Sequence, residues 1–191
     1  MRLHLEKKAI RALGIAESFR KGTGKAVLAG VVMRSDLVID GVALSSTTVR
    51  GDDATDAVIN LYRGLNRNDV NLIMLGGVVI SMYNIIDLDR VHTTLSLPVI
   101  GVTFEESEGL EEHIMRAFKG EQAEMKLQAY RRLGAREKVT LKTGHDVYIR
   151  CAGIHSRVAK RALNRFLLQG AVPEPIRVAR LIARGVLNYV G

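Results

Sequence analysis

The stretch AVLAGVVMR at residues 26–34 is apolar and β-branched on both alternating faces, which is typical of a strand buried at the centre of a sheet. Downstream, LVIDGVALSSTTV at 37–49 continues in strand composition. Upstream, IRALGIAES at 10–18 is a short apolar run that ends in polar residues. The connections KGTGK and RSD supply turn residues. Three such runs with short connections predict an antiparallel meander.

Beyond residue 50 the apolar residues change to helical spacing, because DDATDAVINLYRGL at 52–65 repeats them every three or four positions. Further strands are expected at 70–80 and 97–104, and residues 138–152 have strand character with a turn at 143–146. Further helices are expected at 87–95, 110–133, 156–169 and from 173 onward. In the last helix, the side chains expected to point inward are Val178, Leu181, Ile182 and Val186. Strands followed by alternating helices and strands predict an α/β fold: a mixed sheet, a meander followed by parallel strands, with helices on both faces. This is the plan of the ribonuclease H-like fold, one of several that the pattern allows.

The chain has 191 residues, of which 47% are hydrophobic and 25% charged, as in one globular domain with a substantial core. We therefore expect residues 1–191 to form a single domain. Cys151 is the one cysteine, which excludes an internal disulfide framework and a thiolate zinc site. Glu6, Lys7 and Lys8 precede any apolar run, unlike a signal peptide. The longest uncharged stretch, Val70–Ile86, is short for a membrane span. A cytoplasmic protein without membrane contact is expected.

The positive charge is concentrated in the last third of the chain. Residues 1–125 carry 14 Lys/Arg and 17 Asp/Glu, a net charge of −3, whereas residues 126–191 carry 14 Lys/Arg and three Asp/Glu, a net charge of +11. A basic helical part at 155–191 attracts anionic partners, nucleic acid first among them. A solvated helix surface that happens to use arginine is an equally weighted alternative. The predicted nucleic-acid contacts are Arg157, Lys160, Arg161 and Arg165.

Divalent-cation chemistry on phosphodiesters needs several carboxylates that converge on one point. The carboxylates near expected strand ends are Glu17, Asp40, Asp52, Asp53 and Asp87. Glu17 ends the first apolar run, and a solvated strand end is an equally good interpretation of it. For Asp52 and Asp53, capping of the following helix is the favoured interpretation. The chain has no phosphate-loop motif, and GTGK at 22–25 is better read as a hairpin turn.

Several motifs together resemble an archaeal family, domain of unknown function 99. They are RALGIAESF, AVLAGVVMR, DGVALSSTTVRGDDAT, VNLIMLGGVVISMYNIIDL, LPVIGVTF and, at the end, GAVPEPIRVARLIARGV. The likeness runs from about residue 9 to 187. The family is regarded as related to endonuclease V, so the resemblance implies a ribonuclease H-like fold. Endonuclease V nicks nucleic acid near deaminated adenine, using Mg²⁺ held by acidic residues on neighbouring strands, so the resemblance also implies a site of this kind.

Compared position by position, two acidic ligands that the resemblance implies are replaced. Where the family has Gly-Ile-Asp-Asp, this chain has Gly-Ile-Ala16-Glu17, and where it has Leu-Asp-Gly, this chain has Leu-Gly76-Gly. Arg50 stands where the family tends to have Asp, while Asp53 matches a later Asp of the family. Glu17 is not a simple replacement for Ala16, because neighbouring strand residues point to opposite faces.

Three hypotheses follow. The first is a nucleic-acid-binding protein with an endonuclease V-like fold and a degenerate metal site. The second is an active endonuclease on deaminated or structured nucleic acid, which holds Mg²⁺ or Mn²⁺ with a set rebuilt from Glu17 and Asp53, with Asp40 or Asp87 as further candidates. The third is a protein-interaction module without enzymatic activity. Only the second implies a cofactor. The sequence leaves open the oligomeric state, the choice of DNA or RNA, and whether the basic helices form one surface.

Overall fold

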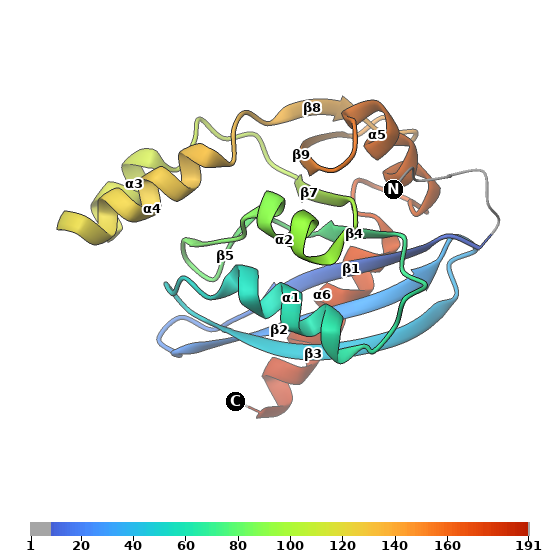
Figure 1. The fold of residues 1–191 in the computed structure, drawn as a ribbon, viewed down its shortest axis with the longest axis horizontal. Helices are drawn as coiled ribbons and strands as arrows, with labels where there is room; N and C mark the ends of the chain where they lie inside the picture. Colours follow the sequence, from blue (N-terminus) through green and yellow to red (C-terminus); the bar gives the residue numbers. More distant parts are fainter. Residues whose placement is uncertain (1–8, 191) are drawn as a thin grey trace.

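The computed structural model describes residues 9–190, which form one mixed seven-stranded sheet, a two-stranded ribbon and six helices (Figure 1). The elements are β1 (Arg11–Ser18), β2 (Lys25–Arg34), β3 (Ile39–Thr48), α1 (Ala54–Gly64), β4 (Leu72–Leu75), β5 (Val79–Ile80), β6 (Asn84–Ile85), α2 (Leu88–Leu95), β7 (Val99–Thr103), α3 (Glu111–Ala117), α4 (Gly120–Arg132), β8 (Glu137–Thr140), β9 (Asp146–Ala152), α5 (Ser156–Arg165) and α6 (Glu174–Val190). The residues before 9, on which the expected lack of a signal peptide rests, lie outside this range.

The strand order is β3-β2-β1-β4-β7-β9-β8. β1, β2 and β3 form the predicted antiparallel meander, and β4 and β7 run parallel to β1. β9 then pairs antiparallel with β7, and β8 with β9. The predicted plan of a meander followed by parallel strands is therefore confirmed. The antiparallel β8–β9 hairpin extends it at one edge.

Helices cover both faces of the sheet, as predicted. One core packs α1 and α2 against the face that carries Leu13, Ile15 and Ile73. The other core packs α5 and α6 against the opposite face, which carries Ala12, Ala16 and other small or aliphatic residues. In Figure 1, α1 and α2 lie in front of the sheet and α6 crosses behind it, while the α3–α4 hairpin projects beyond the sheet. No helix in residues 9–190 is long and apolar enough to cross a membrane.

The last helix rests on the sheet through small residues. α6 buries Ile176, Ala179, Ala183 and Leu187, while Leu181, expected to point inward, is 55% exposed. The expectation was wrong for Leu181, whereas Val178 and Ile182 pack against the core as expected. The helix lies so close to β1 that a Cβ on Gly14 would be 2.2 Å from the carbonyl carbon of Pro175. Alanine permits this approach, whereas leucine does not.

Two further expected elements are divided in the structure. The strand expected at 70–80 ends at Leu75, because the following glycines leave the sheet and residues 79–85 form the β5–β6 ribbon. The helix expected at 110–133 breaks into α3 and α4 around Phe118, whose backbone is extended. The Phe118 ring packs edge-on against Tyr83, with ring centroids 5.8 Å apart. A tertiary contact thus overrides a continuous helical pattern.

Candidate functional site

The carboxyl ends of the parallel strands β1 and β4 carry the two positions where the resemblance implies acidic ligands. The Gly76 amide donates a hydrogen bond to the Ile15 carbonyl (2.9 Å), which holds Gly76 beside Ala16. A Cβ on Gly76 would lie 2.8 Å from Cγ2 of Ile176 and 3.7 Å from the Ala16 Cβ. Ala16 is 4% exposed. An apolar contact with α6 therefore fills the space that a carboxylate at position 76 would need, and the residues here do not fit a divalent cation.

Glu17 points to the other face of the sheet. Its carboxylate accepts hydrogen bonds from the Ser81 amide (2.7 Å) and from the Ser81 hydroxyl. Ser81 is fully buried. Both oxygens of Glu17 are thus used to hold the loop that follows β4, and they face away from Ala16 and Gly76.

Asp53 lies at the start of α1 but does not cap it, contrary to the favoured expectation. Its carboxylate accepts hydrogen bonds from the Thr47 hydroxyl (2.6 Å), from the Thr48 amide and hydroxyl, and from the Asn84 amide group (2.7 Å). Asn84 Oδ1 instead accepts the bond from the Ala54 amide (3.0 Å). Burial raises the pKa of the Asp53 carboxyl, but these hydrogen bonds lower it by more, so its pKa lies well below the usual value.

The remaining sequence-predicted carboxylates are spread over the fold. Asp40 forms ion pairs with Arg11 and Arg67 beside the start of β1. Asp52 pairs with the Lys126 ammonium (2.7 Å), and Asp87 accepts the Arg90 amide at the start of α2 (2.9 Å). Within residues 9–190, no three His, Cys, Asp or Glu side chains are grouped so that they could hold a metal ion.

Residues 81–83 form an unusual turn that links these groups. Ser81, Met82 and Tyr83 all have positive φ values, of 45°, 57° and 74°, in a conformation that non-glycine residues rarely adopt. The Arg50 amide donates to the Ser81 carbonyl (2.7 Å). Lys126, only 2% exposed, donates to the Tyr83 carbonyl (3.0 Å). The turn is therefore held by three separate parts of the chain, through Glu17, Arg50 and Lys126, which offset its backbone strain.

Arg50 does not reach the Ala16–Gly76 position either. Its guanidinium donates to the Ala117 carbonyl and lies 4.6 Å from the centroid of the Phe118 ring. The guanidinium of Arg50 thus attaches α3 to the body.

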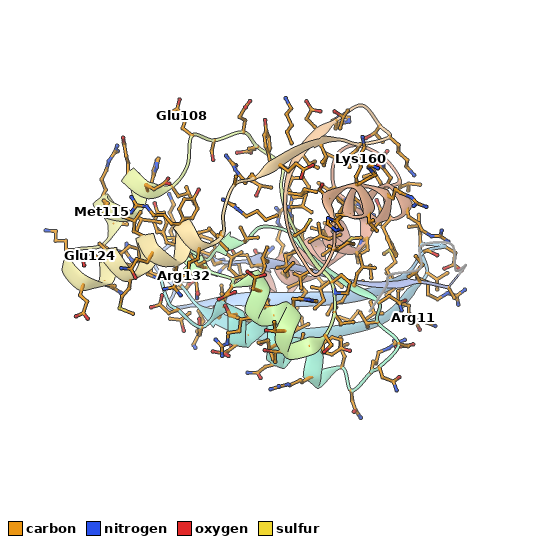
Figure 2. The ribbon with its side chains drawn as sticks, turned by 45° about the horizontal axis from the view of Figure 1, so that its top comes forward. Arg11, Glu108, Met115, Glu124, Arg132 and Lys160 are labelled. Carbon is orange, nitrogen blue, oxygen red and sulfur yellow. The ribbon has the colours of Figure 1, made fainter. Side chains whose placement is uncertain are left out.

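The predicted nucleic-acid contacts on α5 lie at the opposite end of the sheet. The last residue of β9, Ala152, pairs with Val99 at the start of β7, so α5 begins beside the amino end of that strand. At the other end of α5, Arg165 donates to the Ser35 hydroxyl (3.3 Å), and the Ser35 amide donates to the Ile10 carbonyl just before β1 (2.8 Å). Figure 2 shows Lys160 on the same side of the molecule as Arg11, at the start of β1, and far from Glu124.

α5 has no acidic residue in its sequence SRVAKRALNR. Arg157 and Arg161 are exposed, Lys160 and Arg165 are partly exposed, and Lys142 of the adjacent turn is exposed as well. The basic residues of α6 lie elsewhere: Arg177 pairs with the buried Glu174 (2.6 Å), and Arg180 lies 5.3 Å from the Phe104 ring beyond β7. The basic C-terminal part therefore forms at least two separate surfaces.

Comparison with known proteins identifies the family of this chain. A family model described as Endonuclease dU matches residues 8–187. The chain belongs to the Endonuclease dU family. A UPF0215 protein of Pyrobaculum calidifontis is 42% identical over 179 residues, which cover 93% of this chain and 97% of that relative. The resemblance to an archaeal family of unknown function is thereby confirmed.

Solved structures place this Endonuclease dU family member in the ribonuclease H-like class. A protein of unknown function from Archaeoglobus fulgidus is similar, with a TM-score of 0.79, 26% identity and coverage of 93% of this chain and 98% of its own. Endonuclease V of Ciona intestinalis, in complex with a 24mer DNA that contains an inosine, has a TM-score of 0.60 at 14% identity, with 96% and 88% coverage. This likeness confirms the predicted fold.

The sequence of this Endonuclease dU family member gave little sign of two residues that organise the site. Asn84, fully buried, binds Thr47, Thr48, Asp53 and Ala54. Lys126 lies in a polar helical segment that reads as a solvated face, yet its ammonium is buried and bonds Gly51, Asp52 and Tyr83. Only the position of Asn84 at the end of a long uncharged stretch could have hinted at a buried amide.

Proposed function

We propose that this protein binds nucleic acid through α5 without metal-dependent cleavage at the Ala16–Gly76 position. The absence of metal-dependent cleavage is inferred from the contact of Ile176 with Gly76, which leaves no room for a carboxylate at position 76. Two further facts support this half of the proposal. The Glu17 carboxylate accepts a hydrogen bond from Ser81. The Asp53 carboxylate accepts hydrogen bonds from Thr48 and Asn84. The single-domain organisation and the cytoplasmic location expected from the sequence stay predictions.

The charge of α5 supports the first half of the proposal. A helix with four basic side chains and no acidic ones raises the local positive potential and suits a phosphate backbone. Arginine also donates in a planar fork that matches phosphate oxygens. The Ciona endonuclease V, which has a similar fold, is in complex with DNA, and this likeness supports a nucleic-acid partner. Because α5 and the Ala16–Gly76 position lie at opposite ends of the sheet, a strand bound on α5 need not cross that position.

Binding is tested by fluorescence anisotropy with labelled single- and double-stranded DNA and RNA at two ionic strengths. We expect the affinity to fall steeply with salt, because bound phosphates release counterions. The variant Arg157→Ala/Lys160→Ala/Arg161→Ala should weaken binding and flatten the salt dependence. The matched control Arg63→Ala/Lys119→Ala/Arg131→Ala removes the same charge from exposed positions elsewhere and should have a smaller effect. Equal loss in both variants, or no binding at low salt, would contradict the proposal.

Cleavage is tested with dU-containing DNA, which the family's description suggests, and with inosine-containing DNA and RNA, each with Mg²⁺ or Mn²⁺. No nicking above the no-protein control is expected. Metal-dependent nicking that disappears in Glu17→Gln or Asp53→Asn would instead support the active endonuclease. Salt-insensitive self-association without nucleic-acid binding would support the interaction module.

A further inference from the structure

A cavity of about 660 Å³ lies where the α3–α4 hairpin meets the body. Its walls come from α4, from the first turn of α2 and from β9. It lies on neither of the surfaces discussed so far, because α5 is on the opposite face of the sheet and neither Ala16 nor Gly76 lines the cavity. Its volume is in the range of small-molecule sites, roughly 300–1,000 Å³.

One side of α4 faces this cavity and is available to a ligand. Met125, Ala129 and Arg132 are spaced by four and three residues, so they form one stripe along the helix. Met125 is 60% exposed. A neighbouring stripe with Lys126 and Tyr130 is buried and fixes the helix to the body. The wall is therefore preformed, which lowers the entropic cost of binding.

The charges around the cavity leave two guanidinium groups available. Asp52 is paired with Lys126, Asp87 binds the Arg90 amide, and Arg90 pairs with Asp56. Arg132 makes no hydrogen bond or ion pair within residues 9–190. Arg150 uses its Nε for the Gly134 carbonyl (2.9 Å) and keeps its two terminal nitrogens for other acceptors.

Arg132 of α4 and Arg150 of β9 both line this cavity. Guanidinium groups suit a doubly charged phosphate monoester, which accepts bidentate hydrogen bonds. The same cavity has an apolar part, formed by Leu88 and Met125. The exposed carboxylate of Asp89 is positioned at the rim for N–H donors of a ring.

We propose that this cavity binds a nucleotide that carries a phosphate monoester, with the phosphate at Arg132 and Arg150 and the base against Met125 and Leu88. The chemistry is shared by a free nucleoside monophosphate and by the 5′-phosphorylated end of a strand. It is independent of the backbone binding proposed for α5, because it depends on different residues. In Figure 2, Arg132 lies where α4 joins the body, away from Lys160.

Isothermal titration calorimetry of the full chain tests the proposal. The ligands are AMP, GMP, CMP and UMP, the matching nucleosides, and inorganic phosphate. We expect one nucleotide per chain, and an affinity at least about tenfold weaker for nucleosides and for phosphate alone, because each lacks half of the contacts. A second titration compares a dinucleotide with and without its 5′-phosphate. Preference for the free nucleotide or for the phosphorylated end identifies the source, and either supports the site.

Variants distinguish nucleotide binding in this cavity from non-specific attraction to positively charged side chains. Arg132→Ala should weaken nucleotide binding about tenfold, as should Ala129→Phe, which fills the cavity. Arg131 is the neighbouring exposed arginine and does not line the cavity, so Arg131→Ala should leave nucleotide binding unchanged. The triple α5 variant should also leave it unchanged. A circular dichroism melt confirms that each variant folds. Absence of nucleotide binding, equal binding of nucleosides, or equal loss in Arg131→Ala and Arg132→Ala would overturn the proposal.

Discussion

Ile176 of α6 lies against the Gly76 backbone, with its Cγ2 atom 2.8 Å from the point where a Cβ on Gly76 would stand. The contact joins the carboxyl end of β4 to the first turn of α6. Its position coincides with one of the two acidic positions that the family resemblance implies. The apolar packing of Ile176 therefore occupies the place that a carboxylate at position 76 would need.

Gly76→Asp alone should destabilise the protein by about 2–3 kcal/mol, because the new side chain overlaps Ile176 and buries a charge. The measurement is the free energy of unfolding in urea. Adding Ile176→Ala should remove the overlap but leave a cavity elsewhere, so the double variant should recover only part of the loss. A wild-type stability for Gly76→Asp would contradict the close contact.

The triple variant Ala16→Asp/Gly76→Asp/Ile176→Ala should regain a cation site. Two carboxylates on adjacent parallel strands offer hard oxygen ligands, and bound Mn²⁺ stabilises the folded state. We expect Mn²⁺ to raise its Tm by about 2–4 °C and to leave the wild-type Tm unchanged. The same Mn²⁺ shift in both proteins would show that the ion binds elsewhere.

Asp53→Asn should lower the free energy of unfolding at pH 7 by about 2 kcal/mol, because the charged acceptor of Thr47, Thr48 and Asn84 is lost. The pKa of Asp53 is lower in the folded than in the unfolded state, so its stabilisation is present above about pH 4 and is lost as the pH falls through the folded value. The difference between wild type and variant should therefore shrink in acid. Urea unfolding at pH 7, 5 and 3 measures it. Glu124→Gln, at an exposed position, is the matched control.

The fold could be predicted where the sequence pattern is local. The meander, α1, α2 and β7 follow from apolar periodicity and turn residues, and the structure has them close to the expected bounds. The end of β4 at Leu75 has a local signal, the two glycines that follow it, which the expectation of a strand at 70–80 overlooked. The break at Phe118 could not be predicted in this way, because it depends on a contact between residues far apart in the chain, Phe118 with Tyr83.

The candidate site was predictable as a set of replaced positions but not as a geometry. Ala16 and Gly76 stood out only against the family motif. That they meet Ile176 depends on how α6 crosses the sheet, which periodicity does not specify. Likewise, α5 was predictable as a basic helix, whereas its position at the amino ends of β1 and β7 follows from the antiparallel β9, a connection that no local pattern indicates.

Lys126→Met should loosen the α3–α4 hairpin more than the body of the protein. The Lys126 ammonium donates to Gly51, Asp52 and Tyr83 and lies 4.9 Å from the Phe118 ring centroid, so it connects α4 to both loops beneath it. Methionine fills similar space but leaves two carbonyl oxygens without their donor, which costs about 2–4 kcal/mol. Because few other buried residues hold α4, the loss should appear first as local opening.

Hydrogen exchange followed by mass spectrometry should show faster exchange in residues 111–132 and little change in β1. Lys119→Met, at an exposed position of the same hairpin, should leave the exchange of both regions unchanged. Uniform acceleration across the sheet in Lys126→Met would mean that the hairpin and the body unfold as one unit.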